Sequence, residues 1–159
     1  MPTRSATGAP PLDPAEELLW RSLTNILIVM RRRVMGDLER RTGIPGTEYL
    51  VLRNLFDAPG RRMRMQALAR ACDLSASRIS RVVDTLVAGG HCAKCPADDD
   101  GRGAVASITA SGVRRLRIAY PAVLESVRAN VFDHLAPDEV SDLGPVLQRI
   151  AAHLGPKSS

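Results

Sequence analysis

The sequence predicts a mainly α-helical protein with one small β-hairpin. Apolar residues repeat at helical spacing over most of the chain, and the pattern changes to short extended segments only between residues 91 and 108. The chain has 159 residues, of which 45% are hydrophobic and 25% are charged, which is typical of one soluble globular domain. Its longest apolar run, residues 26–30, is too short to cross a membrane.

The chain opens with a polar segment that two predicted helices follow. Residues 1–12 are rich in Pro, Ser, Thr, Gly and Ala and lack the apolar core of a secretory signal, so we expect a disordered lead-in. A long helix is predicted over residues 13–41, because Asp13 can cap it and Glu16 follows three residues later. A second helix is expected over residues 45–57.

The middle of the chain has the pattern of a winged helix-turn-helix. A short helix over residues 65–72, a turn at residues 73–75 and a longer helix over residues 76–88 form the helix-turn-helix. Two extended segments at about 91–96 and 104–108 flank a polar tip and predict a hairpin, the wing. A further long helix over about 110–134 and a last helix are expected after it, which gives a mainly α fold with a small β-hairpin wing.

The longer helix of this motif has one apolar face and one face that carries hydroxyl and guanidinium groups. Arginine can donate two hydrogen bonds to a guanine, and serine hydroxyls at a helix N-terminus can reach phosphates or bases. These properties fit a recognition helix in the major groove better than an ordinary solvated face. The predicted DNA-binding residues of this segment are Ser75, Ser77, Arg78, Ser80 and Arg81.

The charge balance is basic, and nearly all the basic residues are arginines. Twenty-two Lys and Arg against 17 Asp and Glu give a net charge of +5, with lysine only at Lys94 and Lys157. The basic connector at residues 61–64 is either a set of contacts to DNA phosphates or a solvated turn. Aromatic residues make up only 3%, which argues against a stacking platform for single-stranded nucleic acid.

Several motifs in order resemble the MarR family, which are bacterial winged helix-turn-helix regulators. The family pattern is L-A, then L-S-x-S…S-R-x-[VI]-x-x-L…G, then D-x-R in the wing and L-T-x-x-G after it. The matching residues here are Leu68-Ala69, residues 74–86, Gly90, Asp100-Gly101-Arg102, Ile108-Thr109 and Gly112, and residues 44–52 resemble the family's upstream motif. Departures are Pro45 in place of a capping Thr, Glu48 in place of the common Gln, and residues 91–94 in place of L-V-x-R.

The resemblance implies a function and two wing residues. It implies a cytoplasmic, sequence-specific transcriptional regulator of double-stranded DNA, most often a repressor that a small aromatic or lipophilic effector releases from its operator. It also implies that Arg102 enters the minor groove, where a narrow A·T-rich groove attracts arginine. Asp100 would support the wing by bracing Arg102 or an arginine of the recognition helix. The resemblance places the effector pocket among the first, second and fifth helices, with Trp20 and Tyr49 either lining it or packing in the core.

The resemblance further implies a homodimer, and the sequence supports this independently. The terminal helices carry more apolar surface than a lone domain of this size can use, although a monomeric bundle burying the same stripes is the alternative. We therefore expect N-terminal dimerisation residues 13–44, a DNA-binding domain at 45–109 and C-terminal dimerisation helices at 110–155. A two-fold dimer predicts a palindromic operator with half-sites about 10 bp apart.

One cluster suggests a different mechanism. His91, Cys92 and Cys95 form a C-x-x-C beside a histidine, so the alternative is a metal- or redox-responsive regulator. In a strand, however, positions three apart point to opposite faces, which predicts no metal site here. Three unevenly placed cysteines also do not make a disulfide scaffold, which favours a reducing compartment.

Two other classes of protein are less well supported. The sequence lacks a nucleophile elbow, a phosphate-binding glycine loop and a zinc-protease motif, so we expect neither an enzyme nor a cofactor. A protein-interaction module without DNA binding would be favoured by the loss of arginines from the polar face, but Arg78, Arg81 and Arg102 are all present.

Overall fold

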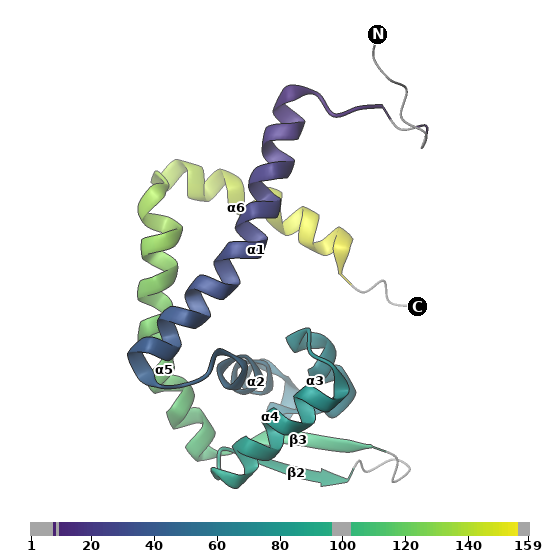
Figure 1. Cartoon of the computed structure of the whole chain (residues 1–159), viewed down its shortest axis with the longest axis vertical. Helices are drawn as coiled ribbons and strands as arrows, with labels where there is room; N and C mark the ends of the chain where they lie inside the picture. The colour runs from purple at the N-terminus through teal and green to yellow at the C-terminus, as the bar shows by residue number, and fades with distance from the viewer. Residues whose placement is uncertain (1–7, 9, 97–102, 156–159) are drawn as a thin grey trace.

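The computed structural model describes residues 8, 10–96 and 103–155 and has the predicted architecture, mainly helical with a small antiparallel sheet (Figure 1). The elements in chain order are α1 (Pro14–Thr42), α2 (Gly46–Asp57), the 3₁₀ turn η1 (Pro59–Arg61), β1 (Arg62–Arg64), α3 (Met65–Cys72), α4 (Ala76–Ala88), β2 (Cys92–Pro96), β3 (Ala104–Ile108), α5 (Ala110–Asn130), the 3₁₀ turn η2 (Phe132–His134) and α6 (Pro137–Leu154).

Helix α1 begins and ends where its terminal residues predict. The Asp13 carboxylate accepts hydrogen bonds from the N–H groups of Ala15 and Glu16, and the Glu16 carboxylate accepts one from the N–H of Asp13, which completes a capping box. Gly43 ends the helix in the left-handed conformation, with φ of 68°. Helix α2 starts after Pro45 without a side-chain cap, as the departure at Pro45 predicts.

The sheet has three strands in the order β1-β3-β2, all antiparallel. The hairpin of β2 and β3 confirms the predicted wing, with Cys92 paired to Ile108 and Pro96 to Ala104. The basic connector is not only a turn, because its residues 62–64 form β1 and pair with β3. The side chain of Met63 is half-buried against the core while Arg62 and Arg64 are exposed, so the alternation of a strand is present in three residues.

One hydrophobic core lies under α2, α3, α4 and the sheet, and we call it the winged-helix core. Its completely buried side chains come from all three helices and from the end of α1, and the first half of α5 closes it through Leu116 and Ala119. The largest of these side chains are Leu38, Leu52, Leu55, Leu68, Ile79 and Leu86. One face of the recognition-helix candidate α4 is therefore buried in this core.

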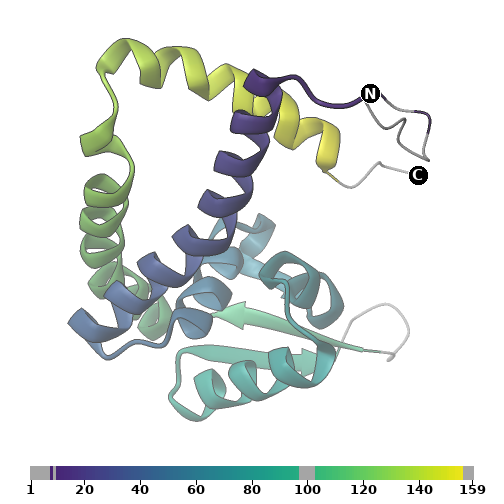
Figure 2. The ribbon, with the colours of Figure 1, turned by 45° about the horizontal axis from the view of Figure 1, so that its top comes forward.

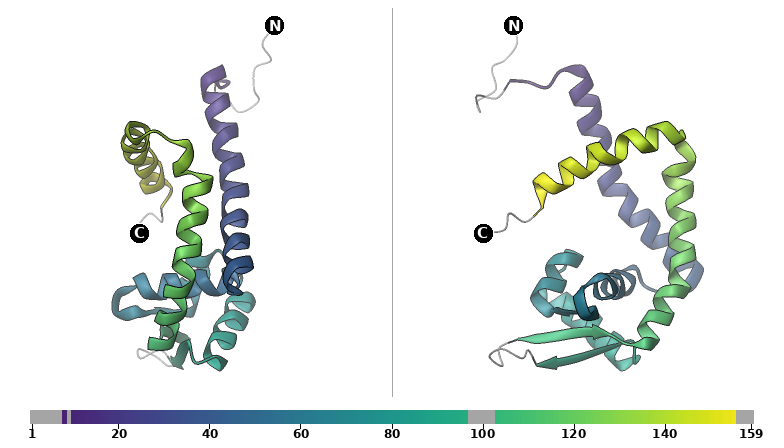
Figure 3. Two further views of the ribbon diagram at one scale, coloured as in Figure 1. Left: turned by 90° about the vertical axis from the view of Figure 1, so that its left-hand side faces the viewer. Right: turned by 180° about the vertical axis from the view of Figure 1, so that it is seen from behind.

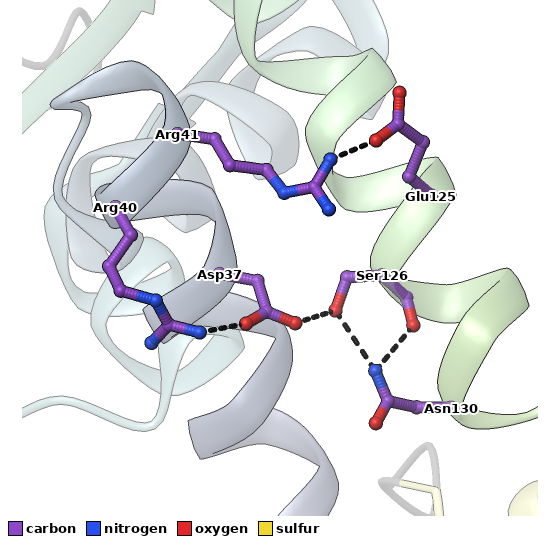
Figure 4. A network of polar contacts seen from close by, with 6 residues as sticks. All are labelled: Asp37, Arg40, Arg41, Glu125, Ser126 and Asn130. Carbon is purple, nitrogen blue, oxygen red and sulfur yellow. Dashed lines mark hydrogen bonds and ion pairs between the residues drawn. The ribbon is translucent and has the colours of Figure 1, made fainter.

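The C-terminal part of α1 packs beside α5, and a polar network joins the two helices (Figures 3 and 4). The hydroxyl of Ser126 donates to Asp37 Oδ2 at 2.5 Å, and the Asn130 amide donates to the carbonyl and hydroxyl oxygens of Ser126. Arg40 pairs with Asp37, and Arg41 pairs with Glu125 across the helices. The Ser126 hydrogen bond and the nearby arginines lower the pKa of Asp37 below its usual value.

The helix predicted over 110–134 is shorter in the structure. Helix α5 continues through Pro121 but ends at Asn130, because Val131 leaves the helical region with φ of −132° and ψ of −69°. A short 3₁₀ turn follows, and α6 then extends from the end of α5 that lies away from the sheet (Figure 2). No residue of α6 is buried.

The outer surfaces of α1 and α6 are strongly apolar. On α1, Leu18, Trp20 and Leu27 are 68%, 60% and 74% exposed. The apolar stripe of α6 is also exposed, and its members are Val140, Leu143, Val146, Leu147, Ile150 and Leu154. Within the described ranges, no helix has the length and apolarity needed to span a bilayer.

Candidate nucleic-acid interface

The turn between α3 and α4 sets the start of the recognition-helix candidate. Asp73 ends α3 in the left-handed conformation with φ of 55°, and its N–H and that of Leu74 donate to the carbonyls of Arg70 and Ala69. Ser75 then caps α4, because its hydroxyl accepts a hydrogen bond from the N–H of Arg78 at 3.3 Å. The cap confirms the predicted start of this helix.

Helix α4 has the two faces that its sequence predicts. Ile79, Val83 and Leu86 are each no more than 1% exposed, so one face is fixed in the winged-helix core. The opposite face is open to solvent around the N-terminal half of the helix. Of the predicted DNA-binding residues, Ser75, Ser77, Arg78 and Arg81 are exposed there and Ser80 is half-buried beside them.

A polar contact that sequence reasoning missed fastens the wing to α4. Lys94 of β2 donates to Asp84 of α4 at 2.9 Å, and its Nζ lies 3.4 Å from the Ser80 hydroxyl, which itself donates to Asp84 at 3.2 Å. The Lys94 hydrogen bond is the main cause that lowers the pKa of Asp84. Ser80 is thus engaged within the protein, and Asp84 and Lys94 join α4 to the first strand of the wing.

The wing tip lies outside the described residues, and both Arg102 and Asp100 belong to it. The arginines of the basic connector, residues 61–64, are exposed at the edge of the sheet. Arg62 and Arg64 lie on β1, and the guanidinium of Arg61 stacks over the ring of Phe56 at 4.8 Å. Residues 62–64 are a strand and not a turn, and phosphate contacts of these exposed arginines stay a prediction.

The two cysteines of the C-x-x-C point away from each other. Cys92 is buried at 4% exposure, Cys95 is exposed, and the ring of His91 is hydrogen-bonded to the hydroxyl of Ser111. Burial, together with the nearby Glu48 carboxylate, raises the pKa of Cys92 to about 11, so its thiol stays protonated at neutral pH. Among the described residues no group of three His, Cys, Asp or Glu side chains could hold a metal ion.

A cleft of about 780 Å³ separates α1 and α2 from the turn before α4. Its lining differs from the expected one, because α3–α4 turn residues replace α5. Tyr49 packs in the core and Trp20 lies on the exposed end of α1, so neither lines this cleft. The lining includes apolar residues of α1 and α2 together with Arg31, Arg32, Asp73 and Arg78.

Comparisons with known proteins point to one family. The sequence model of the MarR family matches residues 33–103. No curated protein sequence matches the chain.

Solved structures extend the similarity over nearly the whole chain. Sco3205, a MarR family transcriptional regulator from Streptomyces coelicolor solved in complex with DNA, is 31% identical over 95% of both chains with a TM-score of 0.77. AbsC, a MarR family transcriptional regulator from the same organism, is 29% identical over 94% of this chain and 100% of its own, with a TM-score of 0.75. Wild-type MarR from E. coli has the same fold, with 18% identity, a TM-score of 0.69 and coverage of 89% of this chain and 98% of its own.

Proposed function

Because the chain belongs to the MarR family of transcriptional regulators, we propose that it binds a palindromic operator in double-stranded DNA as a homodimer and represses transcription. The observation that carries this proposal is the exposed polar face of α4, which stands opposite side chains that are completely buried. A helix supported in this way can enter a major groove without changing its position in the protein. The structure of the relative Sco3205 in complex with DNA supports the assignment.

Each predicted site residue has a role in this proposal. Arg78 and Arg81 donate to base edges, for which guanine is the best partner because it offers two acceptors. Arg102 enters the minor groove beside the half-site, and Asp100 braces the wing. The hydroxyls that reach phosphates or bases belong to Ser75, Ser77 and Ser80, the last of which must share its contact with Asp84.

The exposed apolar stripes support the homodimer. A single chain leaves the stripe of α6 and the N-terminal half of α1 in water, and an isolated apolar surface of this extent favours association. We propose that residues 13–44 and 110–155 form the dimer and that residues 45–109 bind DNA. The two-fold axis then sets the operator half-sites about 10 bp apart.

Release by a small effector is the remaining part of the proposed function. A cleft of about 780 Å³ falls in the size range of small-molecule sites, and it touches both α1 and the start of α4. An aromatic or lipophilic effector bound there contacts the dimerisation and DNA-binding parts at once. We place this regulator in the cytoplasm, where its operator would be.

The decisive experiment measures binding to the DNA upstream of the protein's own gene by fluorescence anisotropy, across a series of salt concentrations. We expect selective binding that weakens steeply with salt, since each phosphate contact releases counterions. Arg81→Ala should cost about 1–3 kcal/mol and relax base preference at one position of each half-site. Arg53→Ala removes the same charge from an arginine that pairs with Asp57 within α2, and it is the matched control.

The outcomes separate the parts of the proposal. Binding no tighter than to random DNA, followed by failure to select any site from a random library, would refute operator recognition. Unchanged base preference in Arg81→Ala would remove Arg81 as a base contact. A monomer by analytical ultracentrifugation, both free and on DNA, would refute the dimer.

A further inference from the structure

Helix α5 leads from the winged-helix core to the outer end of the molecule (Figure 3). Leu116 and Ala119 in its first half belong to that core. Pro121 follows them and has no N–H group to donate to the carbonyl of Arg117, so the helix lacks one hydrogen bond and can bend there. We call residues 122–154, which follow this point and include α6, the outer arm.

The outer arm has little buried apolar surface of its own. Ala122 and Ser126 are 7% and 3% exposed, and no described residue after Ser126 is buried. The last buried residue of the arm is therefore polar. Because hydrophobic stabilisation scales with buried apolar area, apolar packing within one chain holds the arm only weakly against α1.

A polar network joins this last buried residue to α1 (Figure 4). The Ser126 hydroxyl donates to Asp37 Oδ2 at 2.5 Å, and it accepts from the Asn130 amide at 3.3 Å. Asp37 Oδ1 also pairs with Arg40 of its own helix. Each of these groups thus has a partner, as buried polar groups require.

Such a network accepts only one placement of the arm. Hydrogen bonds depend on distance and angle, whereas apolar contacts have no direction. A shift of α1 by one turn would replace Asp37 with Arg33 or Arg41, neither of which can accept the hydrogen of Ser126. The pair therefore determines the placement, as single buried polar residues determine register in coiled coils.

We propose that Asp37 and Ser126 are positioning residues that hold the outer arm at one angle about Pro121 and thereby select the spacing of the operator half-sites. Helix α6 is part of the proposed dimer and moves with the arm, so the arm angle decides where the second recognition helix lies. The selection of spacing rests on the proposed function, whereas the fixed angle does not.

The length of α6 makes small changes of angle large enough to matter. This helix has 18 residues and is about 27 Å long. A rotation of about 10° shifts one end of it relative to the other by about 5 Å, more than the rise of about 3.4 Å per base pair. A loosely held arm would therefore allow the dimer to accept more than one spacing.

The angle is tested by double electron–electron resonance between two nitroxide labels on one chain. Native Cys95 is exposed on β2 and takes the first label, and Asp133→Cys in η2, which packs on the end of α5, takes the second. Cys72 and Cys92 are buried and stay unlabelled. With labelled chains diluted in unlabelled protein, we expect one narrow distance distribution, which Ser126→Ala makes about twice as wide.

Three further variants identify the cause. Asp37→Asn weakens the same contact from α1 and should also widen the distribution, which gives a second test if Ser126→Ala fails to fold. Pro121→Ala restores the backbone donor, so its combination with Ser126→Ala should narrow the distribution again. Ser141→Ala removes an exposed hydroxyl that donates to Pro137 within α6, and this matched control should change nothing.

Operators selected from a random library, and then altered by one inserted or deleted base pair between the half-sites, test the consequence for DNA. We expect the unmodified protein to bind the selected spacing about tenfold or more tightly than the altered ones, in line with the cost of a mismatched site. Ser126→Ala should reduce this ratio to about threefold or less, and the added Pro121→Ala should restore it. A purely structural defect would instead weaken binding at every spacing by the same factor.

Each contrary result overturns a defined part. A distribution that is already wide in the unmodified chain, or equally narrow in Ser126→Ala and Asp37→Asn, overturns the positioning role of the pair. A wide distribution that Pro121→Ala does not narrow overturns the bend at Pro121. An unchanged spacing ratio in Ser126→Ala overturns the link to the operator. If the unmodified protein selects no DNA site, the proposed function is refuted, and the distance measurement still decides whether the pair fixes the arm.

Discussion

Gly112 lies where α5 begins against the backbone that leads into the wing, and Gly112→Ala is the most direct test of that junction. A Cβ atom there would lie 2.2 Å from the carbonyl oxygen of His91 and 2.7 Å from Cγ1 of Ile108. Ordinary carbon–oxygen contacts are about 1 Å longer, so the two backbone segments must separate. The neighbouring bonds from Thr109 to the carbonyls of His91 and Gly90, at 3.1 and 2.8 Å, would stretch with them.

The magnitude follows from these contacts. Overpacking a tight site costs about 1–3 kcal/mol, and each hydrogen bond that is stretched costs about 1 kcal/mol. We therefore expect Gly112→Ala to lower the free energy of unfolding by about 3 kcal/mol. The same separation loosens the attachment of α5 to the end of α4, so operator affinity should fall as well.

Urea unfolding followed by circular dichroism measures the effect, at one fixed protein concentration because subunit association adds to stability. Gly144→Ala in α6 is the comparison variant, since in the single chain a Cβ there would meet nothing within 4 Å, and its effect should be much smaller than that of Gly112→Ala. A Gly112→Ala protein within about 0.5 kcal/mol of the unmodified chain would refute the reasoning, because it would show that the junction yields without cost.

Three further predictions test other contacts. The pKa of Asp37 is lowered in the folded protein, so ionised Asp37 stabilises the fold at pH values above 3.8, the usual pKa of this side chain. This stabilisation is lost as the pH falls through the lowered pKa. The destabilisation by Ser126→Ala in urea unfolding should therefore be constant near neutral pH and shrink in acid, and a difference independent of pH would contradict this. At neutral pH, iodoacetamide should alkylate exposed Cys95 much faster than Cys92, which is buried and has a pKa of about 11. Mass spectrometry measures the two rates, and equal rates would favour the redox alternative. Lys94→Met should weaken operator binding in anisotropy while changing stability by less than about 1 kcal/mol, and Lys94→Arg should retain affinity.

The sequence was sufficient for elements whose pattern is local. Helix α4 was predicted from Ser75 to its terminal glycines because its apolar residues recur at helical spacing and its cap is adjacent in the chain. The opposite orientation of Cys92 and Cys95 followed from the period of a strand. These features need no knowledge of distant segments.

Features that depend on distant partners were missed. Strand β1 has only three residues, too few for a detectable period, and it exists because β3 pairs with it more than forty positions later. The contact between Asp84 and Lys94 requires the angle between a helix and a hairpin, which no spacing encodes. The expected pocket lay among the first, second and fifth helices, whereas the cleft is lined by α1, α2 and the α3–α4 turn, because the approach of that turn to α1 is a tertiary property.

The packing of α1 on α5 can form only late during synthesis of the chain. Asp37 bonds to Ser126, which lies 89 positions later in the sequence. At about 5–20 residues per second, roughly 4–18 s of synthesis separate the two side chains. Residues 46–108 are made before α5, but their core closes only when Leu116 and Ala119 of α5 are also in place. During that interval the face of α1 that later packs against α5 is in water.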